Sequence, residues 1–445
     1  MTELLAAVRA QALAACRPRR YGRVVRMVGM SIEVAGISAA IGDGCMLHRD
    51  GEPILAELVS LRDDRSTCLA LGDTTGLKAG ALVEELGRPL PVKVGPQLLG
   101  RVLDGLGRPI DDGPPLVGLE EVGIDGVPPH PLRRGLVDEQ LALGVRVLDG
   151  LLPCGKGQRL GIFAGSGVGK SSLLSMITRG SSADVAVVAL VGERGREVAE
   201  FIARDLGPEG LRRAVVIVAT SDEPALVRIH AAFLATRIAE WFRDGGADVL
   251  LMMDSLTRFA MAQREVGLAA GEPPATRGYP PSVFGLLPRL LERAGTAERG
   301  SITGLYTVLV EGDDMNEPIA DAARSILDGH IQLTRALAEA GHFPAIDVLG
   351  SVSRVAPAVA QAEDLEAAYE IRRLLAAWRD AKDLIEIDAY ARGSNPVVDR
   401  AIGLKPAIDN FCRQRISDLS TLEETRHRLA RLFAPHSPAL SEVQQ

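Results

Sequence analysis

The chain has 445 residues, enough for two or three domains, and its 47% apolar and 24% charged residues are the composition of an ordinary globular protein. Its formal charge of −8, from 50 basic and 58 acidic residues, argues against a surface that seeks nucleic acid, because phosphate backbones are held by clustered positive charge. No apolar run reaches the roughly 18 residues of a membrane-spanning helix, and the N-terminus lacks the apolar core and cleavage site of a signal peptide.

The first 20 residues, MTELLAAVRAQALAACRPRR, predict a short amphipathic segment. Apolar residues recur there at helical spacing, at Leu4, Leu5, Val8 and Ala12, and four arginines supply positive charge, at Arg9, Arg17, Arg19 and Arg20. Such a segment can dock on a partner protein or on a membrane surface. A frayed terminal helix explains the same pattern equally well, so both interpretations stay open.

Residues 21–95 predict a small β-barrel domain. Short β-rich pieces such as GRVVRMVG, SIEVAG, PILAELVSL and STCLALG alternate with glycine and aspartate turns. Many short strands at close spacing are typical of such a barrel. A connector follows at residues 104–135, where abundant glycine and proline disfavour a regular helix.

Residues 96–361 predict an α/β domain, because apolar strand candidates alternate there with helical patterns. The candidates are RLGIFA, VAVVALV, AVVIVA, DVLLMM and SITGLYTVLV. Continuous apolar strands separated by helices indicate a parallel sheet that is covered on both faces.

Residues 362–445 predict a helical C-terminal domain. Scattered cysteines without C-x-x-C spacing indicate a reducing, cytosolic compartment, and they are Cys16, Cys45, Cys68, Cys154 and Cys412.

The stretch GIFAGSGVGKSSLL, residues 161–174, is the clearest motif. It matches the phosphate-loop pattern G-x-x-x-x-G-K-[ST] except that Ala164 holds the first position. That position only starts the turn, and backbone N–H groups further on hold the phosphate, so we expect the extra methyl to leave binding intact. Lys170 can reach the β- and γ-phosphates, and Ser171 can hold Mg²⁺. The expected nucleotide contacts are Gly165, Ser166, Gly167, Val168, Gly169, Lys170, Ser171 and Ser172.

Two carboxylates follow later strands of the predicted sheet. In VALVGERGRE, Glu193 comes at a strand end, where a carboxylate can orient and deprotonate the water that attacks ATP. In DVLLMMDS, five apolar residues lead to Asp254, the arrangement that helps to hold the Mg²⁺ shell. Because ligands bind at the carboxyl edge of such sheets, we expect the loop and both carboxylates to meet there.

Arg354, in GSVSRVAP, follows the last strand-like run and lies far from the phosphate loop in sequence. Phosphoryl transfer gains much from an arginine finger, which a neighbouring chain often supplies. The pattern S-V-S-R alone does not distinguish this role from that of an ordinary surface arginine.

Together these elements resemble the flagellum-specific export ATPases, within the larger family of rotary ATP synthase catalytic subunits and type III secretion ATPases. The likeness covers roughly residues 20–435 and rests on AGSGVGKS, VGERGREVAEFI, DSLTRFAMAQRE, GYPPSVFGLLPRLLERAG, YTVLVEGDDMNEPIADAARSILDGHI and SVSRV. The segment DDMNEPIADAARSILDGHI resembles the flagellar branch, whereas the sequences of injectisome relatives tend to diverge after GDD. The family often has alanine at the first loop position, in agreement with the steric argument for Ala164.

The resemblance implies an N-terminal barrel, a central RecA-like P-loop ATPase domain and a C-terminal helical domain, with ATP and Mg²⁺ as cofactors. It implies that Glu193 is the general base, Arg194 a γ-phosphate contact and Arg354 a finger inserted into the next subunit's site. Phe343, in HFPAID, matches an aromatic residue that packs on the adenine. Asp388 stands where relatives often have glycine, a departure that the sequence does not explain.

The same resemblance implies a homohexamer in the cytoplasm, peripheral at the inner face of the cytoplasmic membrane. Its partners would be the stator protein of the flagellar export apparatus, docked on the first 20 residues, a central stalk protein, the export gate, and export substrates with their chaperones. Nucleic acid would not be a partner.

Three alternatives remain at this point. A ring-shaped RNA translocase needs aromatic side chains in a basic groove, on which the bases stack. Tyr21 is the only Phe, Trp or Tyr in the first 160 residues of the sequence, and the chain is acidic. A non-catalytic subunit of a rotary ATPase lacks the catalytic carboxylate, but Glu193 is present. An injectisome ATPase would hydrolyse ATP in the same way but serve the export of different proteins. Only the amino-acid sequence of residues 313–325 separates it from a flagellar enzyme.

Overall fold

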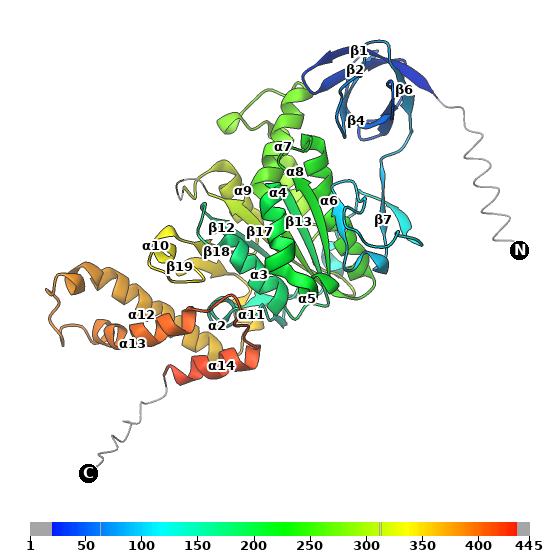
Figure 1. The fold of residues 1–445 in the computed structure, drawn as a ribbon. Helices are drawn as coiled ribbons and strands as arrows, with labels where there is room; N and C mark the ends of the chain where they lie inside the picture. The colour runs from blue at the N-terminus through cyan, green and yellow to red at the C-terminus, as the bar shows by residue number, and fades with distance from the viewer. Residues whose placement is uncertain (1–19, 63, 311, 313, 434–445) are drawn as a thin grey trace, which may run out of the picture.

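The computed structural model describes residues 20–62, 64–310, 312 and 314–433. The predicted docking stripe within residues 1–20 therefore lies outside the described residues, apart from Arg20. A barrel, a central sheet flanked by helices, and a group of C-terminal helices follow one another along an elongated molecule (Figure 1). This arrangement confirms the predicted α/β fold class with its barrel and its helical C-terminal part.

The barrel is closed, and its strands follow the spatial order β1-β2-β5-β4-β3-β6. They are β1 (Tyr21–Val28), β2 (Ser31–Ala35), β3 (Gly44–Leu47), β4 (Ile54–Arg62), β5 (Arg65–Ala70) and β6 (Leu82–Glu85). Buried and partly exposed residues alternate along β2 and β4, as expected for strands with one face in a core. Inward side chains such as Val34, Leu47 and Leu58 form a core of their own.

Short elements lead from the barrel to the sheet. β7 (Pro91–Val94) pairs with β9 (Glu120–Gly123) outside the barrel, and β8 (Val102–Asp104) joins the edge of the central sheet. Residues 104–135, all of them described, contain no α-helix, in line with their glycine and proline content. The remaining short elements are η1 (Pro96–Leu98), η2 (Pro131–Arg133), β10 (Gln140–Leu141), α2 (Arg146–Leu151) and β11 (Cys154–Gly155).

The central sheet follows the order β19-β18-β12-β17-β15-β13-β14-β8, with β16 paired to β17 beside this path. Its further strands are β12 (Arg159–Ala164), β13 (Val185–Glu193), β14 (Ala214–Thr220), β15 (Asp248–Asp254), β16 (Gly295–Thr296), β17 (Ser301–Leu309), β18 (Gly329–Leu333) and β19 (Ile346–Ser353). All five apolar segments predicted as strands lie in it and run parallel. β16 and β19 are antiparallel to their neighbours.

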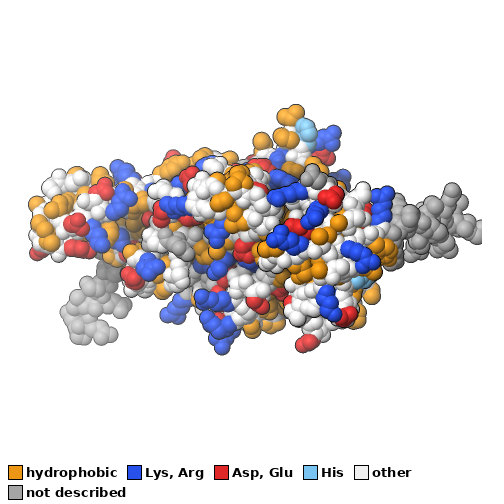
Figure 2. All heavy atoms as spheres, turned by 90° about the horizontal axis from the view of Figure 1, so that it is seen from above, with side chains coloured by type: hydrophobic (Ala, Val, Ile, Leu, Met, Phe, Trp, Pro, Cys, Tyr) orange, Lys and Arg blue, Asp and Glu red, His pale blue; other side chains and the backbone are white. Residues whose placement is uncertain are grey.

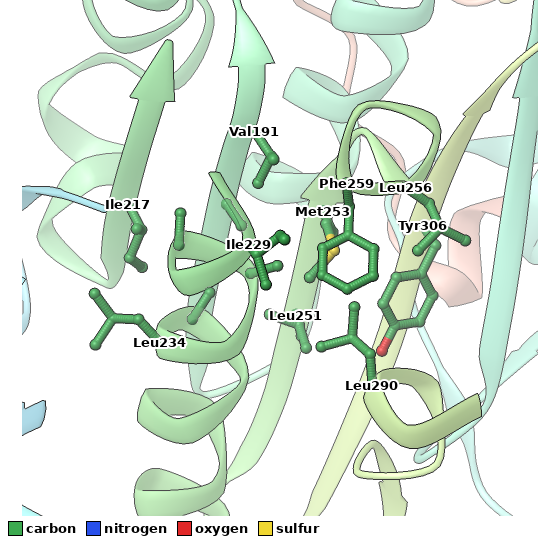
Figure 3. Close-up of a cluster of buried hydrophobic side chains, with 14 of the residues drawn as sticks. Val191, Ile217, Ile229, Leu234, Leu251, Met253, Leu256, Phe259, Leu290 and Tyr306 are labelled. Atoms are coloured by element: carbon green, nitrogen blue, oxygen red, sulfur yellow. The ribbon is translucent and has the colours of Figure 1, made fainter. Parts of the chain in front are cut away.

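Helices bury both faces of this sheet, as its apolar strands require. On one face, α6 (Ala225–Asp244), α7 (Leu256–Ala269) and α8 (Pro281–Leu291) pack over side chains such as Ile217, Leu251 and Met253 (Figure 3). On the other face lies α3 (Lys170–Gly180). Shorter elements around the sheet are α4 (Gly195–Glu200), η3 (Phe201–Leu206), α5 (Gly207–Arg212), η4 (Thr276–Gly278), α9 (Pro318–Ile326), α10 (Arg335–Glu339) and α11 (Ala356–Val359).

Three C-terminal helices complete the described chain, α12 (Ala362–Glu386), α13 (Pro396–Cys412) and α14 (Leu422–Arg431). The starts of the last two are capped: Asn395 accepts the Val397 N–H, and Thr421 forms a capping box with Glu424. Apolar residues such as Ile371 and Phe411 share one core with α2 and α3, so the C-terminal helices are packed onto the phosphate-loop side of the sheet.

The surface agrees with the mixed composition. On the face drawn in Figure 2, acidic, basic and apolar side chains are interspersed. Within the described part of the chain, no helix combines the length and the apolar character needed to cross a membrane.

Candidate active site

The phosphate loop links β12 to α3 at the carboxyl edge of the sheet (Figure 1). Gly167 and Gly169 have φ values of 79° and 87°, and Gly169 directly precedes the first residue of α3. These left-handed conformations favour glycine and let the backbone N–H groups turn toward one point at the helix N-terminus. The glycine spacing in the sequence is therefore the spacing that the loop needs.

The side chains of Ala164 and Val168 are buried, although Ala164 also borders the cavity above the loop. Ala164 is 1% exposed and belongs to the core on the α3 side of the sheet, and its carbonyl accepts the Val310 N–H. Because its φ is not positive, an alanine fits without strain. Val168 is also buried in this core, so its backbone is the part available to a nucleotide. Ser166, Gly167 and Ser171 are exposed.

Lys170 lies between two carboxylates. Its Nζ donates to Asp254 Oδ1 and lies 3.5 Å from Glu193 Oε1. The three side chains are 14%, 7% and 12% exposed, in the order lysine, aspartate, glutamate. The parallel pairing of β13 with β15 brings the two carboxylates to neighbouring strand ends. The structure therefore joins the loop, Glu193 and Asp254 at one edge of the sheet, as the sequence predicts.

The environment of Glu193 disfavours its charged form. Burial raises the pKa of its carboxyl to about 7, and the nearby charge of Asp254 adds to this effect. The ammonium of Lys170 acts in the opposite direction, and Glu197 raises the pKa further. A carboxyl that titrates near neutrality is suited to accept a proton at physiological pH.

A cavity of about 600 Å³ opens above this group. Its wall contains Glu193, Arg194 and most of the phosphate loop. It also contains three charged residues to which the sequence analysis assigns no role, Glu197, Arg258 and Arg335. Arg258 packs against Gly192: a Cβ added at Gly192 would lie 2.8 Å from the Cβ of Arg258. Only the fold reveals these residues as part of the wall, because α7 and α10 bring two of them from distant parts of the sequence.

Phe343 lies beside the phosphate loop. A Cβ on Gly169 would be 3.4 Å from two ring carbons of Phe343, so the ring lies next to the turn. The Gln414 N–H donates to the Phe343 carbonyl at 2.9 Å, which ties the Phe343 segment to the connection between α13 and α14. The ring is 45% exposed and borders a larger hollow of about 1030 Å³. An apolar, half-exposed ring at this place is suited to pack on a nucleotide base.

Arg354 is not part of the cavity wall. It directly follows β19, which pairs antiparallel with β18, so that Ser353 lies opposite Gly329 at the start of β18. The phosphate loop follows Ala164, the last residue of β12, which lies opposite Leu333 at the other end of β18. Arg354 is exposed, and its Nη2 donates to the Arg324 carbonyl at 3.3 Å. Within one chain, Arg354 and the phosphate loop therefore lie at opposite edges of the sheet.

Comparison with known proteins agrees with this geometry. Residues 20–87 match the β-barrel domain and residues 144–353 the nucleotide-binding domain of the ATP synthase alpha/beta family. Residues 360–431 match the C-terminal domain of the T3SS EscN ATPase. The flagellum-specific ATP synthase of Bacillus subtilis is 52% identical over 92% of this chain and 94% of its own length.

Secretion ATPases are similar to nearly the same degree. The type 3 secretion system ATPase of Xanthomonas euvesicatoria is 51% identical over 92% of both chains. The assembled ATPase EscN from the enteropathogenic E. coli type III secretion system superposes with a TM-score of 0.88 at 48% identity, covering 92% of this chain and 99% of EscN. EscN in complex with its central stalk EscO superposes with a TM-score of 0.86 at 48% identity, over the same shares of both chains.

The barrel, the sheet and the C-terminal helices thus each match the corresponding part of one kind of enzyme, along more than nine tenths of the chain. The chain belongs to the ATP synthase alpha/beta family, to its branch of flagellum-specific and type III secretion ATPases, and it is an ATPase.

Proposed function

We propose that this ATPase is the motor subunit of the flagellar type III protein export apparatus and assists the unloading and export of flagellar proteins. The observation that carries the proposal is the convergence of Lys170, Glu193 and Asp254 on the phosphate loop. It occurs in a chain that aligns with flagellum-specific relatives over nearly its whole length.

The residues present fit ATP with Mg²⁺. The Gly-rich turn at the start of α3 is suited to phosphates, and Phe343 next to Gly169 is suited to adenine. The Ser171 hydroxyl and the Asp254 carboxylate are oxygen donors, the ligand type that Mg²⁺ prefers. When bound, the cation would neutralise charge on the β- and γ-phosphates. We assign Lys170 to the phosphates and Ser171 with Asp254 to the cation.

Glu193 is the general base in this proposal. Its carboxylate takes a proton from the attacking water while the water oxygen bonds to the γ-phosphorus and the bond to the ADP oxygen breaks. Arg194, on the cavity wall, contacts the γ-phosphate. The guanidinium of Arg194 lies 3.4 Å from Glu197 and is 73% exposed, so it is free to turn toward a phosphate.

The working form in this proposal is a homohexameric ring. The position of Arg354, at the edge opposite its own phosphate loop, supports a role in the site of a neighbouring chain. The solved relative in complex with its central stalk supports a stalk protein as a partner of such a ring. The other proposed partners are the stator protein, the export gate, and export substrates with their chaperones.

We place the enzyme in the cytoplasm, peripheral to the inner face of the cytoplasmic membrane. The sequence basis is the stripe of Leu4, Leu5 and Val8 with its neighbouring arginines. The overall charge of −8 supports the expectation that nucleic acid is not a partner.

An injectisome ATPase is the second candidate, because secretion ATPases match nearly as well as flagellar ones. The chromosomal substitution Glu193→Gln in the host of this protein separates the two. We expect loss of secreted hook and filament proteins and of swimming, with any injectisome secretion intact. Glu298→Gln is the matched control, since Glu298 is an exposed carboxylate that pairs with Arg133 away from the cavity.

Motile Glu193→Gln cells with normal filament export would contradict the flagellar assignment. Loss of effector secretion in motile cells would instead assign the enzyme to an injectisome.

A further inference from the structure

The register of the sheet places a buried hydroxyl beside the carboxylate of Asp254. β15 and β17 are parallel neighbours in which Met253 lies opposite Tyr306, so the next residues, Asp254 and Thr307, end up side by side. Thr307 is 0% exposed, and its Oγ1 donates to Asp254 Oδ1 at 2.7 Å. The Met253 carbonyl is more distant, at 3.4 Å, so the single hydroxyl proton goes to the carboxylate.

Two donors share one oxygen of this carboxylate. Lys170 Nζ also donates to Oδ1 of Asp254. In the part of the chain that the structure describes, these two bonds hold the carboxylate through Oδ1, which leaves Oδ2 available to another ligand. A triphosphate in the loop attracts the ammonium of Lys170, because its negative charge exceeds that of one carboxylate. Thr307 then remains as the side chain that holds Asp254 in place.

We propose that Thr307 is a positioning residue for the magnesium site. Its hydroxyl keeps the Asp254 carboxylate in one orientation, with Oδ2 open to the hydrated cation, while Lys170 transfers its contact to the phosphates. A buried carboxylate that loses its only fixed donor is free to rotate and is costly to keep charged. The inference rests on the proposed magnesium role of Asp254 and adds to it the residue that orients this ligand.

The test measures how much Mg²⁺ tightens the binding of a fluorescent ATP analogue, by titration of the full chain with Mg²⁺ and with EDTA. Thr307→Val removes the hydroxyl at nearly constant volume. We expect the magnesium enhancement to fall by about tenfold, the size of a lost hydrogen bond to a charged group. Binding in EDTA should change by less than about twofold, because Thr307 does not line the cavity that holds the nucleotide.

Two variants separate orientation from general damage. Thr307→Ser keeps the hydroxyl and should retain the wild-type enhancement. Thr303→Val is the matched control: Thr303 is 1% exposed on the same strand, and its Oγ1 accepts the Gly157 N–H at 2.9 Å, outside the site. If Thr307→Val does not fold, as judged by circular dichroism, the pair Thr307→Ala and Thr307→Ser gives the same comparison.

The inference is wrong if Thr307→Val keeps the wild-type enhancement, or if Thr303→Val loses as much. Wild-type protein that binds the analogue equally well in Mg²⁺ and in EDTA would show that the proposed magnesium site itself is wrong. If Mg²⁺ tightens analogue binding in the wild type and to the same extent in Thr307→Val, the magnesium site stands and only the role of Thr307 is wrong.

Discussion

Glu193 shows how much the neighbours of one side chain decide its chemistry. A glutamate at a strand end is ordinary in sequence, but here burial and the charge of Asp254 raise its pKa to about 7. Lys170 opposes this rise, and Glu197 strengthens it. The result is a group that is half ionised near neutrality, whereas an exposed glutamate is fully ionised there.

The pH dependence of ATP hydrolysis should report this pKa. A general base works only when ionised, so kcat/KM should fall below about pH 7, approaching tenfold per pH unit. Glu197→Gln removes a neighbour that raises the pKa, so the fall should move to lower pH. Steady-state rates from pH 5.5 to 9 with each enzyme give the comparison.

Glu193→Gln is the check on this interpretation. It should bind ATP normally and lose on the order of a hundredfold or more in rate. A variant that keeps more than about a tenth of the wild-type rate means that another group is the base. An unshifted profile in Glu197→Gln would assign the titration to a different residue.

At the scale of elements, the end of α12 accounts for an unusual residue. Asp388 has a φ of 57°, in the left-handed region that glycine adopts most readily. The N–H groups of Ala389 and Tyr390 donate back to the Leu384 carbonyl at 2.8 and 3.1 Å and close the helix. The position therefore favours glycine, and aspartate is among the few other residues that tolerate it.

Asp388→Gly should stabilise this helix end, by roughly 0.5 kcal/mol, and Asp388→Ala should destabilise it by a similar amount. Hydrogen exchange of the Ala389 and Tyr390 amides reports the local effect. We expect protection in the order Gly, Asp, Ala. An alanine variant that is protected as well as the glycine variant would show that the left-handed conformation is not retained in solution.

The reversal of β19 is the second decisive feature at this scale. The connection from β18 spans residues 334–345 and holds only the short helix α10. A parallel return normally runs through a crossover built around a full helix, and the 5-residue α10 is too short to provide one, so this connection favours an antiparallel pair. That reversal moves Arg354 to the edge of the sheet opposite the phosphate loop.

At the scale of the whole molecule, a single chain carries the loop and the proposed finger on different edges, so its activity should depend on assembly. An arginine finger contributes on the order of a thousandfold in rate. Specific activity should therefore rise steeply with protein concentration. Mixing Arg354→Ala with Lys170→Ala subunits, each inactive alone, should restore part of the activity, because some interfaces pair an intact loop with an intact finger.

Two outcomes would count against this view of the ring. Mixed rings without any recovery would mean that Arg354 acts within its own chain or that every site must be intact. Specific activity that does not change with concentration would reject the need for a ring.

The sequence by itself determined most of the fold and predicted that the phosphate loop, Glu193 and Asp254 meet at one edge of the sheet. Continuous apolar runs such as VAVVALV form strands wherever helices can cover both faces, and the phosphate loop is local in sequence. Glu193 and Asp254 were predictable because each directly ends a buried strand, and parallel strands bring their carboxyl ends to one edge.

Only the tertiary structure decided which distant side chains join them. Arg258, Arg335 and Thr307 reach the site through helix packing and strand register, which depend on long-range pairings that no local pattern encodes. The same holds for the pKa of Glu193, since burial and neighbouring charges exist only once the chain has folded.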